Sequence, residues 1–81
     1  MEYYLGQIVL FPYTTFNPSG WLSCQGQTLQ VAQNQALFSL IAFTFGGNGS
    51  TTFCVPDLRG ASPIAGMQYF IATEGIYPTR D

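Results

Sequence analysis

The residues best able to do chemistry lie in the stretch TTFCVPDLRG, residues 51–60, where Asp57 and Arg59 stand two positions apart. The chain has two basic and four acidic residues, and it contains neither Lys nor His. Catalysis needs a proton shuttle or an activated nucleophile, and the chain offers no His, no Lys and no second acid near Asp57. An Arg can instead form a bidentate bond to a carboxylate, and an Asp can accept backbone N–H groups in a turn. The spacing therefore predicts a structural clamp, with no catalytic residue, no metal site and no cofactor.

The thiols and the serine hydroxyls are the other groups that could react. Cys24 and Cys54 are not in a C-x-x-C spacing, and a chain without His is a poor zinc ligand. Without His or Lys, neither thiol has an obvious partner that would activate it, so both are expected to be small buried side chains. A disulfide within or between chains is the alternative. The serines lack a base to activate them, which excludes a hydrolase.

The composition limits the partners of the protein. Only 7% of the residues are charged, so uncharged polar side chains must cover the surface. Copies with so little charge repel one another weakly, which favours self-association over a soluble monomer. Nucleic acid binding is excluded, because Arg59 and Arg80 cannot form the basic cluster that phosphates require. The longest apolar run, ALFSLIAF, is too short for a membrane span of about 20 residues.

The N-terminal segment MEYYLGQIVLF lacks the basic start and the cleavage site of a secretory signal peptide. The chain is therefore expected to be mature, or to be exported by another route. Its length of 81 residues and its hydrophobic content of 47% predict a single domain over residues 1–81.

Apolar alternation and β-branched or aromatic residues predict several short strands. Gly26 can adopt the positive φ of a tight turn, so WLSCQGQTLQV is expected to form a hairpin. With one helix, these elements predict an α+β domain with mostly antiparallel strands. The expected strands span Tyr4–Phe11, Trp21–Cys24, Gln27–Val31, residues 51–55 and Gln68–Thr73.

The predicted helix lies in NQALFSLIAF. Leu37, Leu40 and Ile41 have the spacing of one apolar helix face, and Asn34 is a suitable N-cap. The helix is expected to end before FGGNGS, whose glycines predict a turning loop. No GK[ST] follows these glycines, so the loop is not expected to bind phosphate.

Several of these segments, taken in order, resemble the phage tail collar domain family, which is also seen in microcystin-dependent-protein-like sequences. YLGQIVLF resembles the opening strand of the family, and NPSGWLSCQGQTL resembles its Pro-x-Gly-Trp-x-x-Cys-x-Gly-Gln segment. QNQALFSLIAFTFGGNGSTTFCVPDLRG resembles its helix, Gly-rich loop and Pro-Asp-Leu-Arg-Gly signature, and YFIATEGIYPTRD resembles its C-terminal strand and ending. Two features depart from the family: ASPIAGM replaces the usual long variable insert, and Ala61 stands where Arg is common.

The resemblance implies a non-enzymatic structural subunit, and the missing insert favours a minimal scaffold over a receptor-recognising form. Copies would associate into a phage-tail-like fibre or an extracellular appendage, with other tail or appendage proteins as further partners. The alternative is a receptor- or glycan-binding module of a tail fibre that uses the loops YTTFNPSG and FGGNGS. Its candidate ligand-facing residues are Phe16, Trp21 and Asn48, although aromatic residues at this density more often fill a core or an oligomer interface. Because Cys54 has no usual counterpart in the family, no intrachain disulfide is expected.

The two terminal segments are the expected contacts between copies. Both are aromatic and prone to form strands, and they lack the Lys and Pro residues that usually protect a sheet edge. Arg80 would meet an acid of a neighbouring copy, Glu2 or Glu74. The alternative is that both ends fray in solvent. The predicted subunit contacts are Glu2, Tyr3, Tyr4, Ile76, Tyr77 and Arg80.

Overall fold

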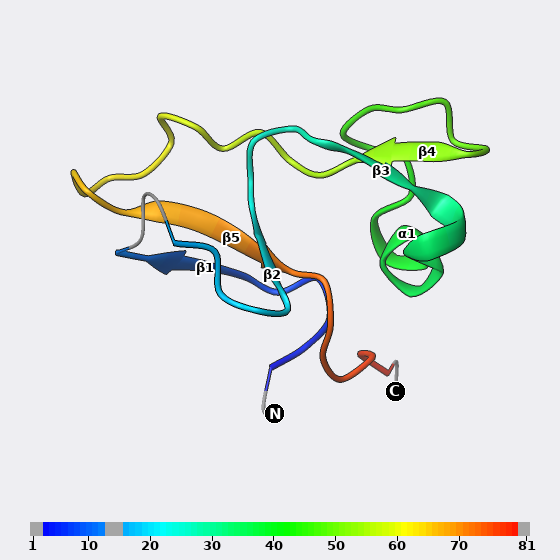
Figure 1. Cartoon of the computed structure of the whole chain (residues 1–81), viewed down its shortest axis with the longest axis horizontal. Coiled ribbons are helices and arrows are strands. Elements are labelled where there is room, and N and C mark those ends of the chain that lie inside the picture. The colour runs from blue at the N-terminus through cyan, green and yellow to red at the C-terminus, as the bar shows by residue number, and fades with distance from the viewer. Residues whose placement is uncertain (1–2, 13–15, 80–81) are drawn as a thin grey trace.

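The computed structural model describes residues 3–12 and 16–79, which form two small antiparallel sheets and one short helix (Figure 1). The larger sheet has the strand order β1-β5-β2, and β3 pairs with β4 in the smaller one. The predicted α+β fold with mostly antiparallel strands is therefore confirmed. The elements are β1 (Ile8–Phe11), β2 (Trp21–Ser23), β3 (Thr28–Gln30), the 3₁₀ helix η1 (Val31–Gln33), α1 (Gln35–Ile41), β4 (Thr52–Cys54) and β5 (Gln68–Ala72).

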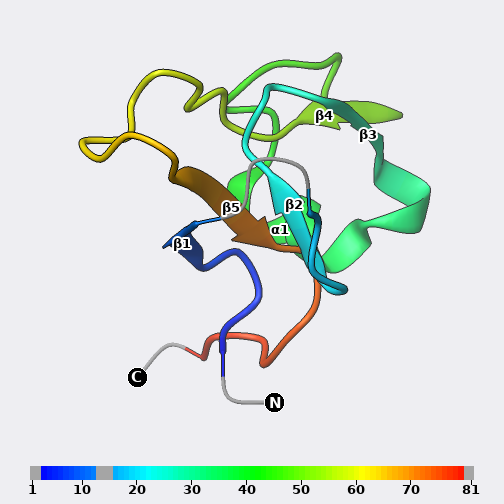
Figure 2. The same ribbon diagram turned by 60° about the vertical axis from the view of Figure 1, so that its left-hand side comes forward.

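Strand β5 is the centre of the larger sheet and lies between β1 and β2 (Figure 2). Phe70 lies opposite Val9 of β1, and Ile71 lies opposite Leu22 of β2. Successive side chains of a strand point to opposite faces of the sheet, yet both Phe70 and Ile71 are buried. Both faces of this sheet are therefore covered, which explains why β5 contains consecutive apolar residues instead of alternating apolar and polar ones.

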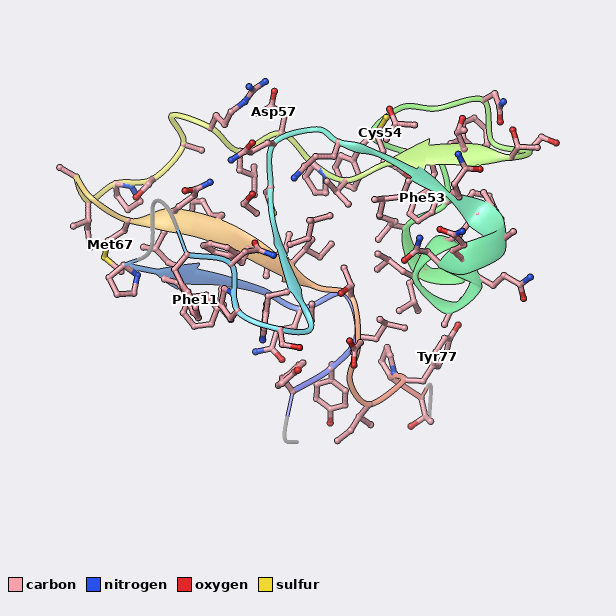
Figure 3. All side chains as sticks on the ribbon, viewed as in Figure 1. Phe11, Phe53, Cys54, Asp57, Met67 and Tyr77 are labelled. Atoms are coloured by element: carbon pink, nitrogen blue, oxygen red, sulfur yellow. The ribbon has the colours of Figure 1, made fainter. Side chains whose placement is uncertain are left out.

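The main core fills the space between the two sheets and α1. Phe53 of β4 is fully buried there, and its ring meets that of Phe38 of α1 edge-on at 5.3 Å between centroids (Figure 3). Its buried residues come from α1, β4, β5 and the links between elements, and partly buried residues of β2 and β3 pack against them, so this cluster holds the small sheet and the helix to the large sheet. Its buried members are Leu5, Cys24, Leu37, Phe53, Val55 and Ile71.

The opposite face of the large sheet carries a second cluster, here called the aromatic cluster, which consists of Trp21, Phe70 and Ala72 with Tyr3, Val9 and Phe11 packed against them. The ring of Phe11 lies 5.3 Å from that of Trp21 and 5.4 Å from that of Phe70, both in edge-on arrangements. The ring of Tyr3 covers Trp21 from another side at 4.7 Å. Aromatic pairs at these separations stabilise by more than their buried area alone.

The sequence prediction of the first strand was too long. The strand begins at Ile8, because residues 4–7 form a turn in which the N–H of Gln7 donates to the carbonyl of Tyr4 at 3.0 Å. Gly6 allows this turn with a φ of 82°. Strands β4 and β5 lie where they were predicted, apart from their end residues.

The predicted hairpin was wrong. Strand β2 pairs with β5, and β3 pairs with β4, so the link through Gly26 joins two sheets instead of turning within one. Gly26 does have a positive φ of 75°, as the turn prediction required. The local chemistry of a turn was thus predicted correctly, but the partners of the flanking strands were not.

The helix prediction is confirmed in place, with one error at its start. Leu37 is buried in the main core, whereas Leu40 is 37% exposed. Asn34 occupies the N-cap position, but its side chain makes no capping bond. Its amide instead donates to the carbonyl of Gln30 at 3.1 Å, which ties η1 to the start of α1.

Candidate functional site

The Asp57–Arg59 corner follows β4, at the point where two buried residues give way to the exposed Asp57. Oδ1 of Asp57 accepts hydrogen bonds from the main-chain N–H of Arg59 at 3.2 Å and from its Nε at 2.9 Å. Oδ2 accepts from Nη2 of Arg59 at 2.7 Å. The side-chain hydrogen bonds from Arg59, followed by its main-chain N–H, lower the pKa of Asp57 to about 2, because they stabilise the charged carboxylate.

This ion pair lies in solvent. The Arg59 and Asp57 side chains are 64% and 47% exposed, and Figure 3 shows Asp57 at the outer side of the molecule. The corner is attached to the rest of the chain by main-chain bonds: Leu58 donates to Cys24 at 2.9 Å, and Gly26 donates to Pro56 at 3.2 Å. The charged groups therefore close a turn, while the main chain docks that turn against the link between β2 and β3. One guanidinium thus occupies both carboxylate oxygens within the same turn.

Asn48, a candidate ligand-facing residue, has its side chain engaged within its own loop. Its Oδ1 accepts three main-chain N–H groups, from Ser50 at 2.8 Å, Thr51 at 2.9 Å and Thr52 at 3.1 Å. Its Nδ2 donates to Oγ1 of Thr51 at 3.1 Å. The amide thus acts as the organising centre of the Gly-rich loop and has little left to offer a ligand.

The two aromatic candidates differ in exposure. Trp21 is only 9% exposed and belongs to the aromatic cluster, so its ring faces other side chains of the same chain. Phe16 is 61% exposed and comes from the loop before β2. Of the three candidate ligand-facing residues, Phe16 is the one whose side chain is placed at the surface with a hollow beside it.

That hollow has a volume of about 310 Å³ and lies beside β2 and β5. Sequence reasoning missed most of it, because Ser23 and Gln68 come together only when β2 pairs with β5. The alternation of Gln68 and Phe70 along β5 was a usable signal, since residues two apart share a face. The lining residues are Phe16, Asn17, Leu22, Ser23, Gln25, Gln68 and Phe70.

The terminal segments pair with each other. Tyr4 forms a parallel bridge with Ile76, in which Leu5 donates to the carbonyl of Ile76 and Ile76 donates to the carbonyl of Tyr3, both at 2.9 Å. Tyr4, Ile76 and Tyr77 are 55%, 51% and 47% exposed. These three side chains are here called the terminal surface.

The remaining predicted subunit contacts have different positions. Tyr3 is half-buried, and its ring covers Trp21 inside the aromatic cluster. Glu2 and Arg80 lie outside the described residues. Tyr77, whose position near α1 is seen in Figure 3, is held by a 2.6 Å hydrogen bond between its hydroxyl and that of Ser39. The C-terminal segment is therefore anchored at Ile76 by the main chain and at Tyr77 by a side chain.

Both thiols are free. Cys24 is buried in the main core, and burial raises its pKa to about 11, because the thiolate would lose its hydration there. Cys54 is half-buried, with its sulfur 3.4 Å from Oγ1 of Thr28. A raised pKa makes Cys24 a poor nucleophile, in keeping with a packing role.

A sequence model of the phage tail collar domain matches residues 6–63, which is well over half of the chain. The match covers the loop centred on Asn48 and the Asp57–Arg59 corner, and it stops before β5. No curated protein matches the chain. In the described part of the chain, no helix has the length and apolar character needed to cross a membrane. The family suggests a structural role in a phage tail, in association with other tail proteins. By this match over residues 6–63, the chain belongs to the phage tail collar domain family.

Proposed function

We propose that this collar domain is a non-catalytic subunit whose copies associate into a phage-tail-like fibre or an extracellular appendage. The contact would be the terminal surface together with Tyr3, and Glu2 and Arg80, which lie outside the described residues, are further proposed contacts. The observation that carries this proposal is that Tyr4, Ile76 and Tyr77 are about half exposed, although main-chain hydrogen bonds hold Tyr4 and Ile76 and a side-chain hydrogen bond holds Tyr77. Burying such apolar area contributes roughly 25 cal/mol per Å². Because these segments are already ordered, association would lose little conformational entropy.

The charge distribution supports the same contact. Among the described residues, the charged side chains are Asp57, Arg59 and Glu74, and the first two pair with each other. None of the three belongs to the terminal surface, so two copies meeting there would bring no like charges of these residues together. A surface of this kind has little electrostatic protection against association.

The outer edge of the large sheet, along β1, has main-chain groups that could pair with a strand of another copy. Ala72 of β5 donates to the carbonyl of Gln7 at 2.9 Å, so alternation along β1 turns the main-chain groups of Ile8 and Leu10 toward the outer edge. The segment IVLF has no charge and no Pro, which are the usual devices against pairing with another strand. Strand addition at this edge would supply backbone hydrogen bonds in addition to the contact at the terminal surface.

The opposite edge, along β2, is covered by the chain itself. Nδ2 of Asn17 donates to the carbonyl of Trp21 at 3.0 Å, and Nε2 of Gln27 donates to the carbonyl of Ser23 at 2.8 Å. The N–H of Trp21 donates to the carbonyl of Pro18 at 3.1 Å. Side chains and loop thus occupy groups that a second strand would need, which supports the β1 edge and not the β2 edge as the contact.

A matched pair of substitutions tests the proposal. Ile76 belongs to the terminal surface, and Ile64 is equally exposed, at 53% against 51%, but lies in the link before β5. We expect the unmodified protein to form assemblies whose size rises with concentration in sedimentation equilibrium. Ile76→Ser should shift it toward the monomer, and Ile64→Ser should not. A monomer at every concentration, or equal effects of the two substitutions, would contradict the proposal.

The second candidate function is a receptor- or glycan-binding module. It is favoured by one observation, the exposed Phe16 bordering the hollow beside β2. Trp21 and Asn48 do not support it, because the ring of Trp21 is packed and the amide of Asn48 is engaged in its loop. Binding that is lost on substitution of Phe16 while assembly is kept would favour this function over a purely structural one.

A further inference from the structure

We infer that the hollow beside β2 binds a neutral saccharide unit, with the amides of Gln25 and Gln68 and the hydroxyl of Ser23 as hydrogen-bonding groups and Phe16 as an apolar platform. This inference rests on the second candidate function. It holds whether or not copies associate through the terminal surface, because none of the lining residues belongs to that surface.

The fold builds the hollow from fixed parts. Ser23 lies directly opposite Phe70 in the β2–β5 pairing, and Gln68 shares the face of Phe70 because it is two residues away on the same strand. Phe70 is 1% exposed and forms part of the floor. Gln25 is held at the end of β2, where its N–H donates to Oε1 of Gln27 at 2.9 Å. The polar groups of the hollow are therefore attached to ordered main chain.

These polar groups are available to a ligand. Within the described part of the chain, the side-chain amides of Gln25 and Gln68 and the hydroxyl of Ser23 make no hydrogen bond to protein. Asn17 uses its Nδ2 for the carbonyl of Trp21, which leaves its Oδ1 as an acceptor. An amide offers donors and an acceptor, and a hydroxyl offers both. This mixture matches sugar hydroxyls, which also donate and accept.

The charge and size of the hollow narrow the ligand class. Its lining contains no charged residue, so a phosphate or carboxylate ligand would find no counter-charge there. Its volume of about 310 Å³ falls at the lower end of the roughly 300–1,000 Å³ range of small-molecule sites. Phe16 adds an exposed aromatic face, against which the C–H face of a sugar ring can pack. A single neutral sugar, or one unit of a longer glycan, fits these features.

Titration with simple sugars, followed by NMR of the backbone and side-chain amides, tests the inference. The probes are methyl α-D-glucopyranoside, methyl β-D-galactopyranoside and N-acetyl-D-glucosamine, with D-glucuronic acid as the matched charged sugar. We expect at least one neutral probe to shift the side-chain signals of Gln25 and Gln68 with a Kd on the order of 1 mM, which is ordinary for a ligand of this size. Added salt should leave this Kd unchanged, since no charge takes part.

Matched substitutions locate the binding. Gln68→Ala should weaken it about tenfold, as the loss of one good hydrogen bond predicts, whereas Gln33→Ala in η1 should not change it. Phe16→Ala should weaken it, whereas Phe45→Ala, at an exposed aromatic outside the hollow, should not. No shift with any neutral probe, shifts confined to other residues, or tighter binding of the charged sugar would overturn the inference. The NMR titration measures sugar binding whether the protein is a monomer or an assembly. A monomeric protein that binds sugar would therefore contradict the proposed self-association but not this inference.

Discussion

In each of the two turns that flank β4, a side-chain oxygen accepts hydrogen bonds from main-chain N–H groups, but the number of these bonds differs. In the Gly-rich loop, Asn48 accepts three main-chain N–H groups with one oxygen. In the corner after β4, Asp57 accepts one main-chain N–H and otherwise pairs with Arg59. The corner has the charges, and the loop has more of the bonds that hold the main chain. Of these two side chains, the neutral amide of Asn48 therefore holds more of the main chain than the charged Asp57 does.

The surroundings of the two turns explain this difference. The loop lies against the main chain of β4, because an added Cβ at Gly47 would come within 2.4 Å of Cα of Phe53. The corner faces water, and an added Cβ at Gly60 would have no atom within 4 Å. A charged pair retains its hydration at an exposed corner, whereas a close-packed loop needs neutral groups that can be satisfied locally.

The largest effect is expected from Gly47→Ala. Gly47 has a φ of 93°, so alanine would suffer backbone strain of about 1–2 kcal/mol, and its contact with β4 would add about 1–3 kcal/mol. Gly60→Ala is the matched control, because its φ of 80° imposes the strain without the contact. Thermal unfolding should show a fall in Tm for Gly47→Ala at least twice that for Gly60→Ala. Equal falls would mean that the loop is no more tightly packed than the corner.

A smaller effect is expected from Asn48→Ala. This change removes the acceptor of three N–H groups, of which water can replace part, so the free energy of unfolding should fall by about 1–2 kcal/mol. Asn48→Asp keeps the acceptor oxygen and loses only the donation to Thr51, and should therefore retain most of the stability. Denaturant unfolding measures both changes. An Asn48→Asp protein as unstable as Asn48→Ala would show that the acceptor oxygen is not what organises the loop.

Arg59→Ala should change stability less than either substitution in the loop. The side chain is 64% exposed, so the pair is solvated and contributes little to stability. The bond from Leu58 to Cys24 that docks the corner does not involve the side chain. We expect a Tm close to that of the unmodified protein and unchanged sedimentation. A loss of stability comparable to that of Asn48→Ala would show that the clamp holds more than its own turn.

The corner and the loop also show what the sequence could reveal. The spacing predicts a structural clamp at Asp57 and Arg59, but it does not identify the acceptor that Arg59 binds; in the structure this acceptor is the Asp57 carboxylate. Their exposure could not be predicted, since it depends on which elements cover the corner. For the same reason, Asn48 was a candidate for ligand contact when only its loop position was known.

Pairing between strands that are distant in the sequence likewise limited how much of the fold and of the hollow could be predicted. Periodicity located β4, β5 and α1, because these elements carry their pattern within a few residues. The partner of β2 could not be found this way, since the turn at Gly26 is compatible with a hairpin as well as with a link between sheets. Strand β5 pairs with β1 on one edge and β2 on the other, and its residues Phe70 and Ile71 pack into clusters on opposite faces of the sheet. These tertiary contacts, and not the local turn, determine the partner of β2. The error hid the hollow, whose walls come from β2 and β5 together.

The smallest effect is expected from the titration of Asp57. Its pKa is lowered from 3.8 to about 2 in the folded chain, so the folded state binds its proton less readily than an unperturbed carboxyl does. The contribution of the pair to stability is therefore complete above pH 3.8 and disappears as the pH falls toward 2. The Tm of the unmodified protein should fall slightly more over this interval than that of Asp57→Asn. The two proteins differ only in this carboxyl group, so the difference isolates Asp57. It should shrink in high salt, because the pair is exposed. A difference that is large, or that salt leaves unchanged, would mean that the pair is shielded from solvent and that the contrast between the charged corner and the neutral loop is wrong.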